Sequence, residues 1–382
     1  MQYNKTYFDN TISRLDTGSK KWDKYRGTDI LPFWVADMDF PTPDFILDAI
    51  KKRLEHPIMG YSDYEPSLNA SLCHWLSKKH NWAIDQEWIT WTPGVVPGLN
   101  LAALTLSGKG SILIPTPVYP PFLEIARNAK LDCVKTAMQE SDLQYSFDFD
   151  QMEKDITPDT RMLFICNPQN PTGRSFDQDE LGALANFIER HDLVLVSDEI
   201  HCSILLDKNK SHLPIARDYP EITSRTISLF SVAKTYNIPG MRCAASIIPN
   251  KKLREQFRTV MRGVVPNVGP LESLASIAAF SDESDWTTQL NSYLSKNSLI
   301  LKESMGDRMR LPEATYLAWI RIDDLKIKQI EKYFDQYGLG ISPGDQFGDQ
   351  HFVRFNFACP EKQLYAGIER LELAIDQAPR AR

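Results

Sequence analysis

Three short apolar stretches, each followed at once by polar residues, limit the folds open to this 382-residue chain. They cover residues 161–166, 193–197 and 226–230, and the middle one reads Leu-Val-Leu-Val-Ser. A strand that is apolar on both faces is typical of the centre of a parallel sheet. Between the first two stretches, Asp177 and Glu180 predict a capping box at the start of an amphipathic helix. Apolar strands that alternate with such helices predict an α/β protein with a mostly parallel sheet between helices.

Each predicted strand is followed by one side chain that could bind or react with a ligand. In open parallel sheets, ligands bind at these carboxyl ends of the strands. These side chains are Asn170, Asp198 and Lys234. Partial burial at a strand end lowers the pKa of a lysine and exposes a nucleophilic amine. Pyridoxal phosphate needs such an amine for its aldehyde, a carboxylate for its pyridine nitrogen and a donor near its phenolic oxygen. Three ordinary loop residues are the alternative, but their combination favours this cofactor.

Other segments favour an anion and a flat ligand at the same edge. Ser231 and Arg242 flank the lysine, and a hydroxyl with a guanidinium is suited to a phosphate. Residues 89–99 read as a strand, a turn and a helix start, where free N–H groups bind anions. This turn matches neither the dinucleotide nor the P-loop glycine pattern. Tyr119 lies in a proline-framed loop and is a candidate to stack on a ring, with core packing as the alternative.

Composition excludes several other classes of protein. The formal net charge is -7, and no basic block predicts a nucleic-acid or anionic-membrane surface. No apolar run reaches the length of a membrane span, and no signal peptide is visible, so we expect a cytoplasmic protein. The six cysteines are scattered without a C-x-x-C pair, which indicates no zinc site. Asp37 and Asp39 lack further metal-ligand residues nearby and are interpreted as turn-forming aspartates; we expect no metal.

Several motifs resemble the fold-type I pyridoxal-phosphate enzymes, the aspartate-aminotransferase superfamily, over nearly the whole chain. Residues 167–173 are similar to the family segment N-P-x-N-P-T-G, and Asp198-Glu199 to its D-E pair. The S-x-x-K sequence that ends at Lys234 resembles the cofactor lysine motif. Within the superfamily, the chain most resembles the cystathionine β-lyase-like C–S lyases, on residues 34–43, 92–97, 117–122, 197–201 and 352–357.

The resemblance implies a role for each matching residue around the cofactor ring and the substrate. Lys234 would bond to the cofactor aldehyde and then move the Cα proton of the substrate. Asp198 would pair with the pyridine nitrogen, Asn170 would contact the phenolic oxygen, and Tyr119 would stack on the ring. Arg354 would clamp the α-carboxylate of the substrate with a bidentate pair. A surface ion pair is the alternative for this arginine.

The resemblance also implies a phosphate site shared between two subunits of a homodimer. Backbone N–H groups of Val95 and Val96 would bind the phosphate, with Ser231 and Arg242 in support. The partner subunit's Tyr61 would reach the same phosphate. Two departures bear on this set: Ala233 stands where many relatives have a second serine, and His201 stands where aminotransferases often have tyrosine. A structural histidine is the favoured interpretation of His201.

The resemblance predicts the type I transferase fold, with an N-terminal arm and part of a small domain in residues 1–48. Residues 49–282 would form the large cofactor-binding domain, and residues 283–382 a small α+β domain. Residues 315–322 and 352–357 alternate in polarity and predict half-buried strands. A long helix is expected around residues 285–305, and the first residues, through Lys21, read as a polar arm.

The function implied is a pyridoxal-phosphate-dependent C–S β-lyase of the cystathionine β-lyase or cysteine desulfhydrase type. It would convert a small sulfur-containing amino acid to pyruvate, ammonia and a thiol. A class I/II aminotransferase that uses the same residues is the alternative. A non-catalytic regulatory protein with the same fold is a remote alternative, and the intact Lys234, Asp198, Asn170 and Arg354 speak against it.

Overall fold

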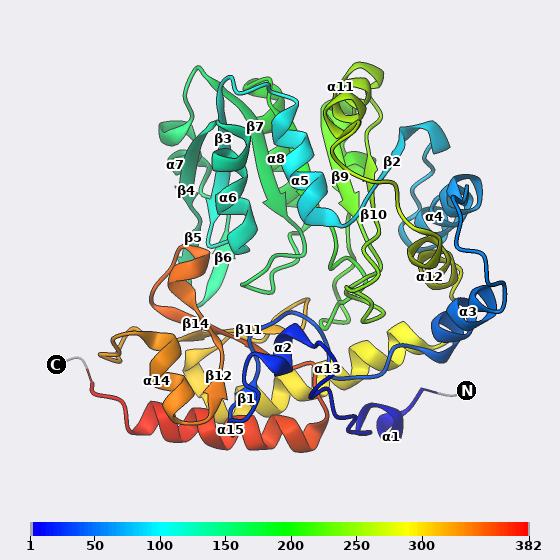
Figure 1. Cartoon of the computed structure of the whole chain (residues 1–382). Helices are drawn as coiled ribbons and strands as arrows, with labels where there is room; N and C mark the ends of the chain where they lie inside the picture. Colours follow the sequence, from blue (N-terminus) through cyan, green and yellow to red (C-terminus); the bar gives the residue numbers. More distant parts are fainter. Residues whose placement is uncertain (1–2, 381–382) are drawn as a thin grey trace.

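A seven-stranded sheet forms the upper part of the molecule in Figure 1, in a computed structural model that describes residues 3–380. Strand β8 (Val194–Asp198) lies between β7 (Thr160–Cys166) and β9 (Thr226–Phe230) and runs parallel to both. On the far side of β7 follow β3 (Ser111–Thr116) and β4 (Asp132–Ala137), also parallel. The prediction of a mostly parallel α/β sheet with its apolar strands at the centre is therefore confirmed.

One strand of this sheet runs against the others. Strand β10 (Ala244–Ile247) pairs antiparallel with β9 on one side and with β2 (Ile89–Thr92) at the sheet edge. The turn that joins β9 to β10 contains Lys234, so this reversal keeps the lysine beside the carboxyl ends of the parallel strands.

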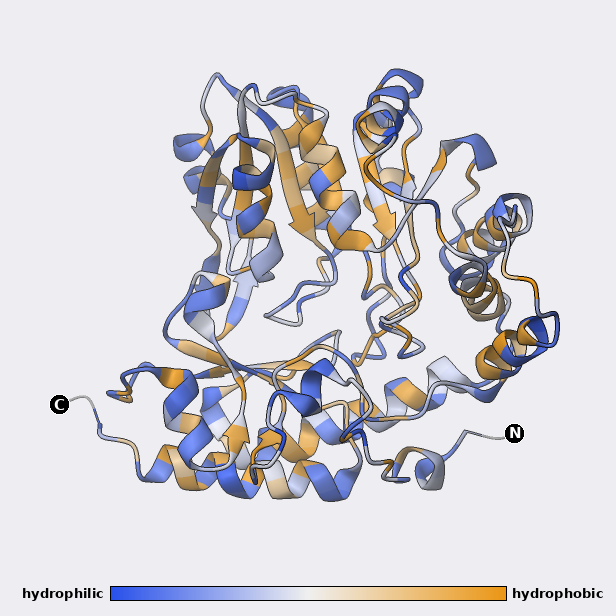
Figure 2. Cartoon of the chain, viewed as in Figure 1, coloured by the Kyte–Doolittle hydropathy of each residue, from blue (hydrophilic) through white to orange (hydrophobic). Residues whose placement is uncertain are grey.

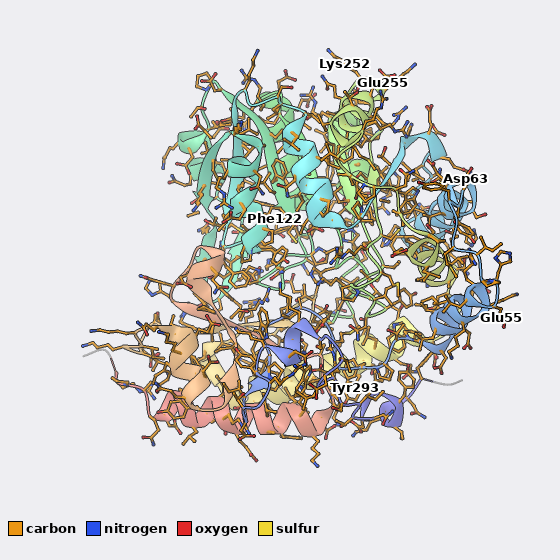
Figure 3. The ribbon with its side chains drawn as sticks, in the orientation of Figure 1. Glu55, Asp63, Phe122, Lys252, Glu255 and Tyr293 are labelled. Atoms are coloured by element: carbon orange, nitrogen blue, oxygen red, sulfur yellow. The ribbon has the colours of Figure 1, made fainter. Side chains whose placement is uncertain are left out.

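Helices cover both faces of the sheet because successive side chains of a strand point to opposite faces. Leu195 packs with helices α8 (Gln178–Arg190) and α7 (Phe149–Asp155). Val196 packs on the other face, where α5 (Val95–Leu104), α6 (Pro120–Ala129) and α11 (Lys251–Met261) supply the partners. Figure 2 shows the strands as predominantly hydrophobic between helices with hydrophilic outer sides. In Figure 3, Phe122 points inward while Lys252 and Glu255 project from the surface.

A second, three-stranded sheet lies below the first and contains β11 (Leu317–Arg321), β14 (Phe352–Asn356) and β13 (Ser342–Pro343). Helices α13 (Trp286–Met305), α14 (Ile330–Gln336) and α15 (Glu361–Asp376) surround it in Figure 1. The prediction of half-buried strands is wrong here, since every residue of β14 is buried. Phe352 and Trp319 stack against each other in the core beneath α8, while Val353 and Phe355 pack toward α13 and α15.

The N-terminal residues complete this lower part. Short helices α1 (Lys5–Phe8) and α2 (Lys20–Asp23) lead to β1 (Leu31–Pro32), which pairs in parallel with β12 (Leu339–Gly340). Helices α3 (Asp44–Leu54) and α4 (Glu65–His80) then pack with α12 (Pro270–Phe280) at the side of the sheet. The remaining elements are β5 (Gln139–Ser141), β6 (Gln144–Ser146), α9 (Ile215–Asp218), α10 (Pro220–Thr223) and 3-10 turns at Gln86–Trp88, Gly306–Arg308 and Gly344–Phe347.

None of the helices within residues 3–380 is both long enough and apolar enough to cross a bilayer.

Candidate active site at the strand ends

A cavity of about 370 Å³ opens beyond the carboxyl ends of β7, β8 and β9. Its walls include most of the residues predicted from the sequence to bind a cofactor, namely Val95, Val96, Tyr119, Asn170, Asp198, Ser231, Lys234 and Arg242. Arg354 adjoins the cavity, because its Nη1 donates to Asn170 Oδ1 at 2.9 Å. Tyr61 stands apart, fully exposed in the loop before α4. The fold therefore gathers residues that lie far apart in the chain.

Lys234 places its amine in the cavity from the turn after β9. Its Nζ donates to the backbone oxygen of Ala36 at 2.5 Å. Burial lowers the pKa of Lys234 to about 8, although the carboxylates of Asp37 and Asp198 oppose the shift. The uncharged, nucleophilic fraction of the amine at neutral pH is therefore much larger than that of a free lysine.

Asp198 is a buried carboxyl group at the end of β8, with 4% of the residue exposed. Among the described residues it accepts one hydrogen bond, from the N–H of Ile200 at 3.0 Å. Burial raises the pKa of Asp198 to about 7. A carboxylate buried with so little compensation calls for a cationic N–H donor in the cavity, and a protonated pyridine nitrogen is such a donor.

Arg354 is a buried cation on β14. Its Nη2 donates to the backbone oxygen of Trp34 at 2.6 Å, and its guanidinium lies 4.6 Å from the ring centre of Phe347. Within residues 3–380 no carboxylate forms an ion pair with it, and its Nε has no hydrogen-bond partner. Burial lowers its pKa to about 10, so it stays charged at neutral pH. An uncompensated buried guanidinium is suited to a substrate carboxylate.

The start of α5 forms one wall of the cavity. Gly94 precedes this helix at φ +117, a conformation that side-chain-bearing residues rarely adopt. The first N–H groups of the helix, from Val95 and Val96, are free of intrahelical partners and suit an anion. Ser231 lies opposite, but its hydroxyl already donates to the oxygen of Cys243 at 2.7 Å. Arg242 is exposed at the cavity mouth.

Tyr119 and His201 line the remaining wall of the cavity. Tyr119 immediately precedes α6, and burial raises the pKa of its hydroxyl, so it is uncharged. His201 is 2% exposed, and its Nδ1 has no partner among the described residues. Burial, with the nearby charges of Lys234 and Arg354, holds the pKa of His201 well below its usual range. Its imidazole is neutral, and Tyr316 packs beside it with ring centroids 6.0 Å apart.

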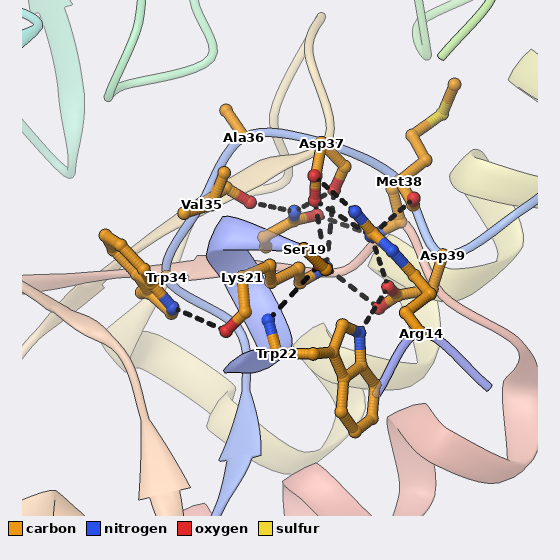
Figure 4. A network of polar contacts seen from close by, with 12 residues as sticks. Arg14, Ser19, Lys21, Trp22, Trp34, Val35, Ala36, Asp37, Met38 and Asp39 are labelled. Carbon is orange, nitrogen blue, oxygen red and sulfur yellow. Dashed lines mark hydrogen bonds and ion pairs between the residues drawn. The ribbon is translucent and has the colours of Figure 1, made fainter. Parts of the chain in front are cut away.

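Sequence reasoning missed the residues that support Lys234 and Arg354 from the N-terminal side. Asp39 lies in a bend, but Asp37 lies in neither a turn nor a bend, so the interpretation as turn-forming aspartates is wrong for Asp37. Both carboxylates pair with Arg14 and Lys21 in a partly buried cluster (Figure 4). No periodic pattern marks these cations, since they lie in irregular sequence before the first predicted helix. Within residues 3–380, no group of three or more potential ligand residues is arranged to hold a metal ion.

The chain also matches a described family along most of its length. The model for aminotransferase class I and II matches residues 28–371. The chain belongs to this family. It is 31% identical to cystathionine beta-lyase PatB of Bacillus subtilis, over 96% of this chain and 99% of that protein.

Two solved structures superpose closely on this chain. The structure of OvoB has a TM-score of 0.94 at 34% identity and covers 97% of this chain and 99% of its own. The PLP-bound C-S lyase from Staphylococcus hominis has a TM-score of 0.90 at 30% identity, with 98% of each chain covered. The family depends on pyridoxal phosphate, and the site described above fits this cofactor, because Asp198, Lys234 and the start of α5 surround one cavity.

Proposed function

We propose that the chain is a pyridoxal-phosphate-dependent C–S β-lyase of the cystathionine β-lyase or cysteine desulfhydrase type. It cleaves a small sulfur-containing amino acid to pyruvate, ammonia and a thiol. The observation that carries this proposal is one cavity that joins the nucleophilic amine of Lys234, the buried carboxyl of Asp198 and the neighbouring guanidinium of Arg354. The full-length similarity to a cystathionine β-lyase and to a C–S lyase supports elimination as the reaction.

Each residue at the ring end has a defined task. Bound pyridoxal phosphate supplies a ring that accepts the electron pair of the broken Cα–H bond. Lys234 holds the cofactor aldehyde and, once freed by the substrate, moves the Cα proton with its Nζ. Asp198 keeps the pyridine nitrogen protonated, Asn170 contacts the phenolic oxygen, and Tyr119 stacks on the ring. Arg354 binds the substrate α-carboxylate, and its contacts with Asn170 and Trp34 orient the guanidinium toward it.

The phosphate end is built mainly from backbone donors. The N–H groups of Val95 and Val96 bind the phosphate, and Arg242 adds charge at the cavity mouth. Ser231 donates to the same anion after its hydroxyl turns from the oxygen of Cys243. The partner subunit's Tyr61 completes the site in a homodimer. Its full exposure, beside the exposed Ile58 and Met59, supports a contact with a second copy.

We also propose a division of the chain into two domains. Residues 1–48 form the arm and part of a small domain, residues 49–282 a large cofactor-binding domain, and residues 283–382 the rest of the small domain. Pairing of β1 with β12 supports the joining of the first and last parts. Helix α3 (Asp44–Leu54) spans the first boundary and connects the two domains. A cytoplasmic enzyme without nucleic-acid or membrane partners is part of the proposal, in agreement with the net charge of -7.

The alternative is an aminotransferase, because the family contains both reactions and the residues named above serve either one. The two reactions separate after the Cα proton is removed. In an aminotransferase, Lys234 would return the proton, and a keto acid would be needed for the next turnover. Elimination expels the thiolate from Cβ, and the release of pyruvate and ammonia consumes water but no keto acid.

The deciding experiment supplies cystathionine without a keto acid and follows pyruvate, ammonia and free thiol. We expect all three in equal amounts over many turnovers. If pyruvate formation stops at about one equivalent per site, or if turnover requires a keto acid, the protein is an aminotransferase and not a lyase. Borohydride reduction of the loaded enzyme, followed by peptide mapping, checks that the cofactor is attached to Lys234.

A further inference from the structure

Residues 34–39 hold both cations of the cavity by their backbone oxygens. The oxygen of Trp34 accepts from Arg354 Nη2 at 2.6 Å. The oxygen of Ala36 accepts from Lys234 Nζ at 2.5 Å and from the Tyr316 hydroxyl at 3.0 Å. These bonds use main-chain atoms, so the place of each cation depends on how firmly residues 34–39 are fixed.

Two asparagines fix these residues from opposite sides. Asn356 of β14 donates through Nδ2 to the oxygens of Val35 and Asp37, at 2.5 and 2.6 Å. Asn237, from the loop after Lys234, accepts from the N–H of Met38 and donates to its oxygen, both at 2.9 Å. Residues 34–39 are therefore tied to both sheets.

A buried ion cluster fixes them further from the side of the N-terminal arm (Figure 4). Arg14 donates to Asp37 Oδ2 at 2.6 Å and to Asp39 Oδ1 at 2.8 Å. Lys21, with no exposed surface, donates to Asp39 Oδ2 at 2.8 Å. Burial opposes the ionisation of Asp39, but Lys21, Trp22 and Arg14 outweigh it and lower the pKa of that carboxyl. The cluster contains two cations and two carboxylates, so its charges balance.

The two carboxylates of the cluster differ in what else they face. Asp39 accepts hydrogen bonds from Arg14, Lys21, the indole N–H of Trp22 and the side-chain amide of Gln363. Asp37 acts on Lys234 and is the strongest charge on it, ahead of Arg354, Asp198 and the thiol of Cys166. Arg354 disfavours the ammonium form of the lysine, while the two carboxylates favour it. Asp37 thus adjoins Ala36, whose oxygen holds the reactive amine, whereas Asp39 lies three residues from Ala36.

We propose that Asp37 is a positioning residue for Lys234, held beside the lysine by Arg14. Through Asp37 and the Ala36 carbonyl, the N-terminal arm fixes the amine of Lys234 and stabilises its ammonium form. This inference deepens the proposed function, since it matters for catalysis only if Lys234 is the cofactor lysine. A lysine that is released by the substrate and then moves a proton must be held while it changes its charge.

The test measures the acid–base midpoint of the Lys234 amine in the cofactor-free protein. Acetic anhydride reacts with uncharged amines, so the rate of acetylation of the Lys234 peptide across pH, followed by mass spectrometry, gives this midpoint. In Asp37→Asn the ammonium loses the carboxylate that favours it most, and we expect the midpoint to fall by roughly 1 pH unit. In Arg14→Gln the carboxylate of Asp37 loses its counter-charge, and we expect a rise of similar size.

Asp39→Asn is the matched control, because Asp39 belongs to the same cluster but is not among the main charges that act on the lysine. We expect the wild-type midpoint for it. An unchanged midpoint in Asp37→Asn, or an equal fall in Asp39→Asn, overturns the proposal. If Asp37→Asn does not fold, Arg14→Gln decides alone, and an unchanged midpoint there overturns the proposal. Cofactor attachment at Lys234 is tested separately by borohydride mapping, so the two failures are distinguishable.

Discussion

At the scale of single residues, the buried carboxylate of Asp198 lowers the stability of the cofactor-free fold, and the cofactor would offset this loss. Its pKa is about 7 in the cofactor-free fold against a usual 3.8, because burial disfavours the charged carboxylate. Since the folded pKa is raised, stability is fully present below about pH 4 and is lost as the pH rises through about 7. The loss at pH 8 is on the order of a few kcal/mol. A cationic ring nitrogen in the cavity removes this cost.

The first prediction follows for Asp198→Asn. Without cofactor, we expect the variant to be more stable than the wild type at pH 8, with the difference shrinking as the pH falls toward 4. With cofactor and substrate, we expect it to lose most activity, because an amide does not keep the ring nitrogen protonated. Urea unfolding of both apoproteins across pH, together with steady-state rates, measures the two effects. Parallel stability curves for the two apoproteins contradict the assignment.

The second prediction concerns Arg354. Lysine at this position keeps the positive charge but loses the planar fork that holds a carboxylate with two hydrogen bonds. We expect Arg354→Lys to raise KM for the amino-acid substrate by roughly 10- to 100-fold, which corresponds to about 1.4–2.8 kcal/mol of lost binding. Cofactor retention is the internal control and should be unchanged. A normal KM would show that the substrate carboxylate binds elsewhere.

At the scale of elements, helix α8 is the best-specified part of the chain. Asp177 accepts from the N–H of Glu180 at 3.0 Å, and Glu180 accepts from the N–H of Asp177 at 2.9 Å, which confirms the predicted capping box. Glu180 also pairs with Arg174 at 2.6 Å, so this helix start is tied to the segment that contains Asn170.

The third prediction follows from this cap. Asp177→Ala leaves the N–H of Glu180 without its side-chain partner, and we expect a loss of about 1 kcal/mol in the free energy of unfolding. Catalytic rates should stay unchanged, since the cap lies away from the cavity. Gln178→Ala, one residue along and without a cap bond, is the control. Urea unfolding measures the midpoint of each variant, compared where the dependence of the unfolding free energy on urea is the same. Equal midpoints for the two variants would contradict the prediction.

Sequence patterns were informative wherever structure is set by neighbouring residues. Strand β9 and the strands beside it, the cap of α8 and the placement of Asn170, Asp198 and Lys234 at one sheet edge follow from local periodicity and sheet rules. The ion pairs of Lys21 and the burial of β14 on both faces depend on contacts between distant segments. Alternating polarity in residues 352–357 predicted a solvent-facing side, but Arg354 and Asn356 use that side to bond residues 34–37.

At the scale of the whole molecule, the exposed loop before α4 carries the fourth prediction. Ile58 and Met59 are 67% and 51% exposed, and Tyr61 is fully exposed beside them. We expect a dimer in sedimentation, with these residues buried by the second copy. Tyr61→Phe should then release the cofactor more readily, because a hydroxyl donor to the phosphate is lost, while the dimer persists. A monomer with full activity and normal cofactor retention contradicts this.

The contact of residues 31–39 with residues 338–358 sets an order of events during synthesis. Leu31 pairs with Leu339, and the N–H of Asp39 donates to the oxygen of Ala358 at 2.9 Å. The ribosome makes one side of these contacts early and the other late, whereas the seven-stranded sheet has all its strands once Ile247 has emerged. The sheet is thus free to form first, as a unit. A growing chain therefore acquires the strand ends and Lys234 well before Arg354 exists, and it binds no substrate carboxylate there until its last strands are made.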